Sequence, residues 1–158
     1  MKAMIFAAGL GTRLKPLTDT MPKALVPVAG KPLLWHTIQK LKAAGFDEII
    51  INVHHFAGQI RQYIQDNNRF GIRIEFSDET QALLDTGGGI KKASWFFDDE
   101  KPFLIHNVDI LSDIDLQNLY HFHTNSNSVA TLVVSERKTS RYLLFDKNNH
   151  LAGWINEK

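Results

Sequence analysis

Runs of hydrophobic residues alternate along this chain with segments whose hydrophobic positions recur at helical spacing. Residues 2–8 form an apolar run and residues 48–53 are apolar and rich in β-branched side chains, which predicts two buried strands. Residues 33–44 and 57–65 carry apolar positions three or four apart, which predicts helices. Gly45 follows the first of these helices and predicts a left-handed stop there. An order of strand, long connection, helix, strand and helix is typical of parallel α/β folds.

The second half of the chain continues the alternation. The expected elements are a strand at 72–76, a helix at 88–97, a strand at 103–107, a helix at 116–123 capped by Asp115, a strand at 129–134, and a β-hairpin of 141–145 and 150–154. No internal repeat competes with this order. We therefore predict an α/β fold with a mostly parallel, Rossmann-like sheet and helices on both faces. Ligands of such sheets bind beyond the carboxyl ends of the strands.

The connection after the first strand has the composition of a phosphate-binding loop. Gly9 and Gly11 can adopt positive φ and keep Cβ atoms away, so that backbone N–H groups can point together at phosphate oxygens. Arg13 and Lys23 supply positive charge to the same loop. The segment GLGTRL lacks both the Gly-Lys-Ser/Thr ending of a Walker A loop and the third glycine of a dinucleotide fingerprint. Four prolines between residues 14 and 33 discourage a helix. Taken alone, the segment is equally compatible with a solvated loop.

Composition and charge narrow the class of protein. With 158 residues, 44% of them hydrophobic, the chain can build one core, and one domain is the simplest expectation. A net charge of +1 gives no overall attraction to nucleic acid or to an anionic membrane. The absence of cysteine excludes disulfides and thiolate metal sites. No apolar run approaches the length of a membrane-spanning helix, and we expect a soluble, cytoplasmic protein.

Three motifs, in this order, resemble those of the sugar-1-phosphate nucleotidyltransferases. Residues 9–28 contain GLGTR, then PLT, then PKALVPV; residues 84–90 read LDTGGGI, and residues 103–109 read FLIHNVD. The TGGG form is most similar to the branch that contains N-acetylmuramate-1-phosphate uridylyltransferase and mannose-1-phosphate guanylyltransferase. The resemblance covers residues 1–110 and implies the fold of the nucleotide-diphospho-sugar transferases.

The resemblance also implies a role for each motif. Arg13 with Gly11 would bind the outer phosphates of a nucleoside triphosphate, Lys23 would contact the reacting α-phosphate, and residues 87–89 would bracket the base. Asp109 would hold Mg²⁺, whereas an aspartate in this position with no family match is more often an ordinary turn residue. The predicted catalytic residues are Arg13 and Lys23, the predicted metal ligand is Asp109, and the predicted nucleotide-binding residues are Ala8, Gly9, Gly11, Thr12, Gly87 and Gly88.

The chain departs from the family pattern at three places. Val108 stands where the family has glycine, and we expect it to narrow or reshape the sugar pocket. Ala82 stands where the family has an acidic or amide residue, which leaves the base open. The family takes a second metal-binding aspartate from a segment beyond residue 158, although Asp113 and Asp115 are nearby candidates by position. We therefore expect residues 1–158 to be the N-terminal portion of a single nucleotidyltransferase domain that lacks its C-terminal part.

The expected function is transfer of a nucleoside monophosphate from an NTP to a sugar 1-phosphate, with Mg²⁺ as cofactor and a nucleotide sugar and pyrophosphate as products. The expected partners are these two substrates, without nucleic acid or membrane. Two alternatives stay open: an enzyme similar to phosphocholine cytidylyltransferase, and a nucleotide-binding module without turnover. Because the second metal-binding aspartate is missing, we expect this chain to bind nucleotide weakly and not to turn it over.

Overall fold

A parallel four-stranded sheet forms the centre of residues 1–127. The computed structural model describes residues 1–157 and divides into two compact units, Met1–Asn127 and a second that begins at Ser128. In the first unit the strand order is β5-β4-β1-β6, and all three pairings are parallel. The strands are β1 (Lys2–Phe6), β4 (Glu48–Val53), β5 (Arg73–Asp78) and β6 (Leu104–Asn107). The predicted α/β class and parallel sheet are confirmed.

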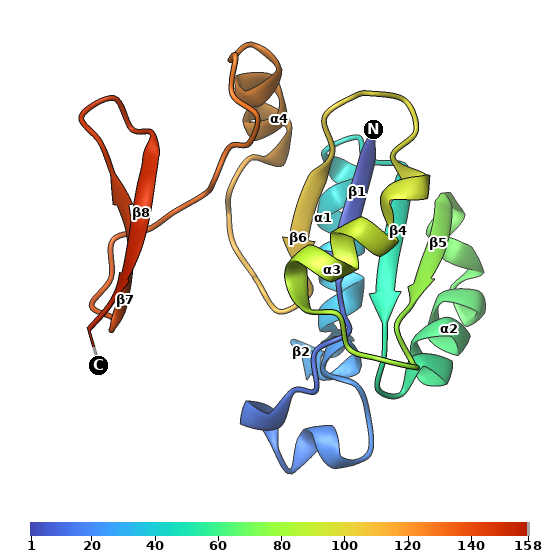
Figure 1. Ribbon diagram of the computed structural model, residues 1–158. Helices are drawn as coiled ribbons and strands as arrows, with labels where there is room; N and C mark the ends of the chain where they lie inside the picture. The colour runs from blue at the N-terminus through green and yellow to red at the C-terminus, as the bar shows by residue number, and fades with distance from the viewer. Residues whose placement is uncertain (158) are drawn as a thin grey trace. The chain divides into compact units, whose positions relative to one another are not determined.

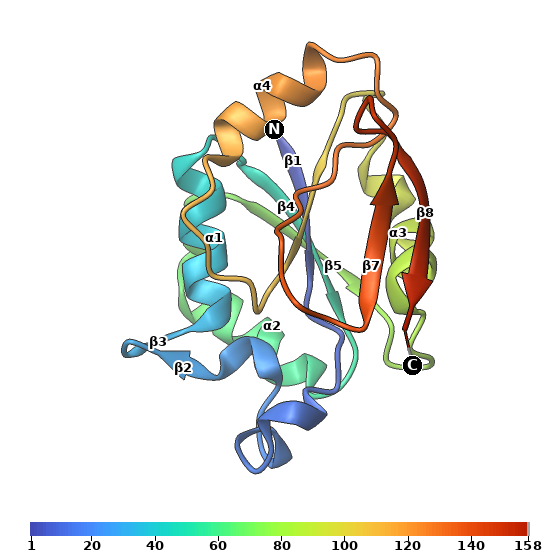
Figure 2. The same cartoon turned by 90° about the vertical axis from the view of Figure 1, so that its left-hand side faces the viewer.

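Helices cover both faces of this sheet. Figure 2 shows α1 (Leu33–Ala43) and α2 (Ala57–Asp66) on one side and α3 (Asp85–Lys92) on the other. Successive residues of a strand point to opposite faces, so β1 contributes to two separate hydrophobic clusters. The larger cluster contains Ala3 and Ile5 of β1 with residues of α1, α2 and α4 (Leu116–Thr124). The smaller contains Met4 and Ile50 with Ala93 and Phe96, which follow α3.

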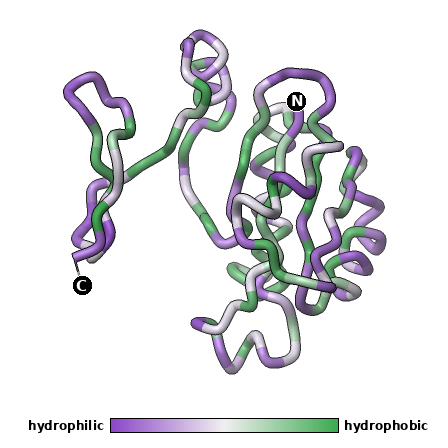
Figure 3. Tube along the Cα trace, in the orientation of Figure 1, coloured by the Kyte–Doolittle hydropathy of each residue, from purple (hydrophilic) through white to green (hydrophobic). Residues whose placement is uncertain are grey.

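The helices on the larger cluster are amphipathic, as their sequence spacing predicts. In α2, Ile60 and Ile64 are fully buried, and hydrophobic and hydrophilic segments alternate along its turns in Figure 3. After α1, Gly45 has φ of +86°, which confirms the predicted left-handed stop. The predicted ends of both helices are correct to within one residue.

The long connection after β1 contains no α-helix, in agreement with its prolines. It forms three short 3₁₀ turns, Thr12–Leu14, Leu17–Asp19 and Lys23–Leu25, followed by the two-residue strands β2 (Pro27–Val28) and β3 (Lys31–Pro32). Figure 1 shows this connection in blue, below the ends of the sheet strands. Two further 3₁₀ turns, Asn68–Gly71 and Ser94–Phe96, follow α2 and α3.

The prediction for residues 88–97 is wrong in its boundaries. The helix α3 begins at Asp85, three residues before the predicted start, and ends at Lys92, five residues before the predicted end, so that Gly87 also lies inside it. Glycine disfavours helices, but this preference is weak and tertiary packing overrides it. Here the buried Gly89 packs closely against the sheet, where any larger side chain would be crowded.

The second unit contains a β-hairpin and an irregular segment. The strands β7 (Arg141–Phe145) and β8 (Leu151–Asn156) pair in antiparallel fashion, which confirms the predicted hairpin. The predicted strand at 129–134 is wrong, because that segment has no regular structure. Its valines favour a strand only when another strand pairs with them, and none pairs with them among residues 1–157. No helix in residues 1–157 is long and apolar enough to cross a membrane.

Candidate nucleotide site

The first and third sequence motifs meet at the carboxyl edge of the sheet. The strands β1 and β6 are parallel neighbours, so the segments that follow them leave the sheet at the same edge (Figure 1). The backbone N–H of Val108 donates to the carbonyl of Phe6 at 3.1 Å, which ties the start of one segment to the end of the other strand. This is the edge at which sheets of this kind bind ligands.

Lys23 and Asp109 form an ion pair at this edge. The Lys23 Nζ atom lies 3.0 Å from Asp109 Oδ2, and the two side chains are 18% and 35% exposed. Lys23 begins a 3₁₀ turn that is anchored on both sides, since Pro22 and Ala24 are buried. The structure thus brings together the predicted phosphate-binding cation and the predicted metal-binding carboxylate.

Gly9 and Gly11 have different structural roles in the first loop. Gly11 has φ of +68°, and a Cβ atom built on it would lie 2.9 Å from Thr18 Cγ2. The Thr18 hydroxyl donates to the Gly11 carbonyl at 2.9 Å and fixes this turn. Gly9 lacks the predicted positive φ; its Cβ position lies 3.7 Å from Lys23 Nζ, so the glycine leaves the ammonium group uncovered. The prediction of positive φ is therefore correct for Gly11 and wrong for Gly9.

Thr12 and Arg13 lie on the solvent side of the same loop. Both are exposed and belong to the 3₁₀ turn that follows Gly11. Within residues 1–157 the Arg13 guanidinium has no carboxylate partner, whereas the neighbouring Lys15 pairs with Asp19 at 3.2 Å. The forked guanidinium is therefore available for an external anion.

Helix α1 holds the segment that carries Asp109. Thr37, only 1% exposed, donates its hydroxyl to the Val108 carbonyl at 3.2 Å, and Lys40 donates to the backbone carbonyl and hydroxyl of Ser112. Sequence reasoning missed both residues. A threonine on the apolar face of the predicted helix was the available signal, but its partner is distant in sequence.

Val108 does not line a pocket. Its side chain is fully buried and belongs to the larger hydrophobic cluster. The expectation that Val108 narrows the sugar pocket is therefore wrong, because alternation along the chain turns this side chain inward and leaves Asp109 at the surface.

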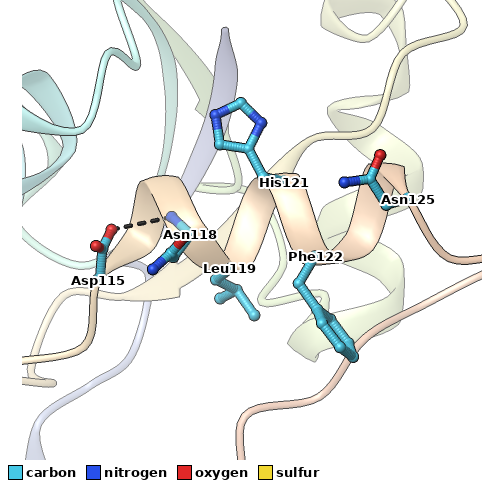
Figure 4. A pocket seen from close by; sticks show the side chains of 6 residues that line it. All are labelled: Asp115, Asn118, Leu119, His121, Phe122 and Asn125. Atoms are coloured by element: carbon cyan, nitrogen blue, oxygen red, sulfur yellow. Dashed lines mark hydrogen bonds between the residues drawn. The ribbon is translucent and has the colours of Figure 1, made fainter.

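Asp115 does not join Asp109. Its carboxylate accepts a hydrogen bond from the Asn118 backbone N–H at 2.9 Å, which confirms the predicted cap of α4. Figure 4 shows this cap beside a shallow hollow lined by residues of α4 and its cap, among them His121 and Phe122. The part of the chain that the structure describes contains no cluster of three or more histidine or acidic side chains. Asp109 therefore does not belong to a cluster of that size.

His106 is a buried titratable group on β6, three residues before Asp109. Burial lowers the pKa of its imidazole below the ordinary value of 6.5, and the charge of Lys40 lowers this pKa further. Its Nδ1 atom lies 2.7 Å from the Asn107 carbonyl oxygen, and Asp109 acts in the opposite direction on the same pKa. Burial therefore favours the neutral form of this imidazole.

Gly87 and Gly88 lie in the first half of α3. A Cβ atom at Gly88 would meet Leu84 Cβ at 2.9 Å, whereas nothing lies within 4 Å of a Cβ at Gly87. No contact joins these two glycines directly to Lys23 or Asp109 in the described residues. Asn52 and Glu79, two buried polar residues that sequence reasoning also missed, lie between the two motifs. The sequence feature that could have indicated each of them is a polar residue at the carboxyl end of an apolar strand.

The fold and the charged edge of the sheet define an α/β protein of the kind that holds nucleotides beyond its strand ends. The family model described as Nucleotidyl transferase matches residues 2–151. The chain belongs to this family, and the predicted recognition of sugar-1-phosphate nucleotidyltransferases is confirmed.

Curated relatives agree with this assignment. The chain is 49% identical over 116 residues to N-acetylmuramate alpha-1-phosphate uridylyltransferase of Neisseria meningitidis, covering 73% of this chain and 49% of that protein. It is 38% identical over 144 residues to UTP–glucose-1-phosphate uridylyltransferase of Synechocystis, covering 84% of this chain and 37% of the relative. It is also 38% identical over 145 residues to mannose-1-phosphate guanyltransferase of Gibberella zeae, covering 90% and 40%. The chain thus spans less than half the length of these relatives.

Solved structures support the fold. HddC from Yersinia pseudotuberculosis, complexed with GMP-PN, superposes with a TM-score of 0.76 at 24% identity and covers 99% of this chain and 69% of its own. A CTP:phosphocholine cytidylyltransferase from Streptococcus pneumoniae superposes with a TM-score of 0.53 at 34% identity, covering 68% of this chain and 44% of its own.

Proposed function

We propose that this chain carries the nucleotide-binding part of a site that transfers a nucleoside monophosphate from an NTP to a sugar 1-phosphate. The products are a nucleotide sugar and pyrophosphate. The 3.0 Å contact between Lys23 Nζ and Asp109 Oδ2 supports this proposal most directly. It joins residues of two motifs that the resemblance assigns to phosphate and metal, and neither motif predicts the other.

In this proposal, different residues of the first loop bind different phosphates of the triphosphate. The backbone N–H groups around Gly9 and Gly11, together with Arg13, hold the β- and γ-phosphates that leave as pyrophosphate. Lys23 offsets the charge that develops on the α-phosphate when the sugar-phosphate oxygen attacks it in line. No protein nucleophile takes part, so positioning and charge supply the catalysis.

Asp109 is the residue of this chain that would hold Mg²⁺. A single carboxylate beside a phosphate-binding loop suits this ion, which keeps water and phosphate oxygens among its ligands. When bound, Mg²⁺ neutralises phosphate charge and orients the α-phosphate. In its absence Lys23 provides the countercharge for Asp109.

The same observations leave a second acceptor class to test. The relative from Streptococcus pneumoniae, at 34% identity, is described as acting on phosphocholine. Cytidylyl transfer to phosphocholine uses the same phosphate chemistry with a cationic acceptor. The two reactions differ in the acceptor and the base, which are the parts that the first loop does not contact.

Calorimetry with UTP, GTP and CTP in the presence of Mg²⁺ tests nucleotide binding by this chain. Pyrophosphate release is then measured with N-acetylmuramate 1-phosphate, glucose 1-phosphate, mannose 1-phosphate and phosphocholine. Release with a sugar 1-phosphate supports the proposed function, and release with phosphocholine alone supports the alternative. Binding without release agrees with a chain that carries only the nucleotide-binding part of the site, and failure to bind any of the three nucleotides contradicts the proposal.

The substitution Arg13→Ala tests the phosphate-binding assignment. We expect it to weaken transition-state stabilisation by about 2 to 4 kcal/mol, or NTP binding by tens of fold where no turnover is detected. Lys15→Ala is the matched control, since it removes an exposed cation of the same loop that is already paired with Asp19. Equal effects of the two substitutions would contradict the role of Arg13.

A further inference from the structure

A network of buried hydrogen bonds connects the first loop to the start of α3. Asn52, at the carboxyl end of β4, accepts hydrogen bonds at its Oδ1 atom from the backbone N–H groups of Ala7 and Ala8, at 2.7 and 3.2 Å. Its Nδ2 group donates to Glu79 Oε1 at 2.9 Å, and Glu79 Oε2 accepts from the Leu84 N–H at 3.1 Å. Asn52 is 2% exposed and Glu79 is fully buried.

Each hydrogen bond in this buried network can have only one donor and one acceptor assignment. Backbone N–H groups stand at both ends and can only donate, so the carboxylate of Glu79 must accept twice and the amide of Asn52 must turn its oxygen toward Ala7 and Ala8. Glu79 has no cationic partner within residues 1–157, so these donors are what compensate its burial.

Gly89 of α3 packs directly against this buried network, on the same face of the sheet as Ile50 and Phe6. A Cβ atom built on Gly89 would lie 3.0 Å from Glu79 Oε1 and 3.3 Å from Asn52 Nδ2. Three segments that are distant in sequence therefore pack on one pair of side chains: the loop after β1, the loop after β5, and α3.

We infer that Asn52 and Glu79 are positioning residues that hold the phosphate-binding loop and the base-binding segment in register. The names of these two segments rest on the proposed function, whereas the physical link between them does not. Neither side chain is accessible to a ligand, so both act through the backbone groups that they bind. A nucleoside triphosphate needs both segments at once, whereas inorganic triphosphate needs only the first.

Two single substitutions break the link without changing side-chain shape. In E79Q, the new NH2 group is a donor that faces another donor, either the Asn52 amide or the Leu84 N–H. If the Asn52 amide rotates to present its oxygen to position 79, its NH2 group then faces the N–H groups of Ala7 and Ala8. In N52D, two buried carboxylates face each other. In N52D/E79Q every donor again meets an acceptor, because the amide at position 79 donates to the carboxylate at position 52 and accepts from Leu84. The double variant also keeps one carboxylate, as the native pair does.

Amide hydrogen exchange, followed residue by residue by NMR, tests the link. Each single variant is expected to speed exchange by about tenfold or more at both ends, Ala7 and Ala8 on one side and Leu84 on the other. The double variant is expected to restore protection at both ends. The surface substitution Asn118→Asp is the matched control and is expected to leave these amides unchanged. Acceleration only at the amides bonded to the altered residue, or a double variant as damaged as the single ones, would overturn the inference.

Binding measurements separate this inference from the proposed function. Each single variant is expected to weaken UTP or GTP binding by about tenfold more than it weakens inorganic triphosphate binding, and the double variant is expected to recover both. If the native chain binds no nucleotide while exchange remains coupled, the proposed function fails and the link stands. If nucleotide binds but exchange at the two ends is independent, the link fails and the proposed function stands.

Discussion

The two sides of the candidate site are held in different ways. The phosphate side, residues 7–26, is bound to Asn52 at Ala7 and Ala8, and the turn beyond them is fixed locally by the positive φ of Gly11 and the hydrogen bond from Thr18. The base side, residues 79–89, has an exposed loop at 80–83 and depends on the buried Glu79 carboxylate. The phosphate side thus has a local turn in addition to its link to β4, whereas the base side depends on that link through Glu79.

Gly11→Ala should break the phosphate side most severely. The left-handed backbone at φ of +68° and the 2.9 Å approach of Thr18 Cγ2 both oppose a side chain here. We expect the free energy of unfolding to fall by about 2 to 4 kcal/mol, with NTP binding lost. Urea unfolding followed by circular dichroism measures the first effect. Gly30→Ala is the control, because its φ is also positive but no atom lies within 4 Å; equal losses would show that Thr18 contributes nothing.

Lys23→Gln should weaken binding on the phosphate side with little effect on stability. An ion pair between partly exposed side chains such as these stabilises a fold by only about 1 kcal/mol. A hydrogen bond to a charged phosphate is worth about 1.5 to 3 kcal/mol, so NTP affinity should fall by tenfold or more. Calorimetry with Lys15→Gln as control measures this difference. A loss of stability with unchanged affinity would make the contact with Asp109 purely structural.

Gly89→Ala should break the base side through packing. The added Cβ would press on Glu79, Asn52 and Phe6, which are held in place, and we expect a loss of about 1 to 3 kcal/mol in unfolding free energy. Gly87→Ala, two positions earlier in the same helix and in open space, should be neutral or stabilise by up to about 1 kcal/mol. Thermal unfolding of the two variants gives the comparison, and a Gly89→Ala protein as stable as native would contradict the close packing.

The smallest expected effect is a pH dependence from His106, which lies beneath the phosphate side. Its folded-state pKa is lowered below 6.5 by burial, so the unfolded chain binds the proton more readily. The stabilisation is fully present above pH 6.5 and is lost as the pH falls from there through the folded-state pKa. Urea unfolding from pH 8 to 5 should show this loss, with a shallower dependence in His106→Gln. The exposed His121→Gln is the control; identical profiles for all three proteins would exclude His106 as the cause.

The contrast between the two sides also explains what could be predicted from the sequence. The apolar pattern predicted β1, β4, α1 and α2 correctly, because each of these elements buries an uninterrupted run or stripe of apolar residues. Lys23 and Asp109 could be predicted as site residues because each belongs to a short, local sequence motif. The structure shows that these two residues form an ion pair, and the roles of all the predicted site residues, this pair included, remain predictions.

Long-range contacts account for what could not be predicted. The boundaries of α3 were wrong because glycine weakens the local signal for a helix start, whereas the close packing of Gly89 on the sheet depends on residues distant in sequence. The strand at 129–134 was wrong because β-propensity needs a pairing partner. Asn52 and Glu79 were missed because neither residue has a local partner that reveals its role.

Val108 restricts how this site can vary. Its side chain lies in the core, its N–H is bound to Phe6 and its carbonyl to Thr37, so the last residue before the Asp109 carboxylate is fixed on three sides. A bulkier or polar residue at position 108 would disturb the interior before it altered any ligand. The orientation of the backbone that carries Asp109 is therefore tied to the integrity of the core.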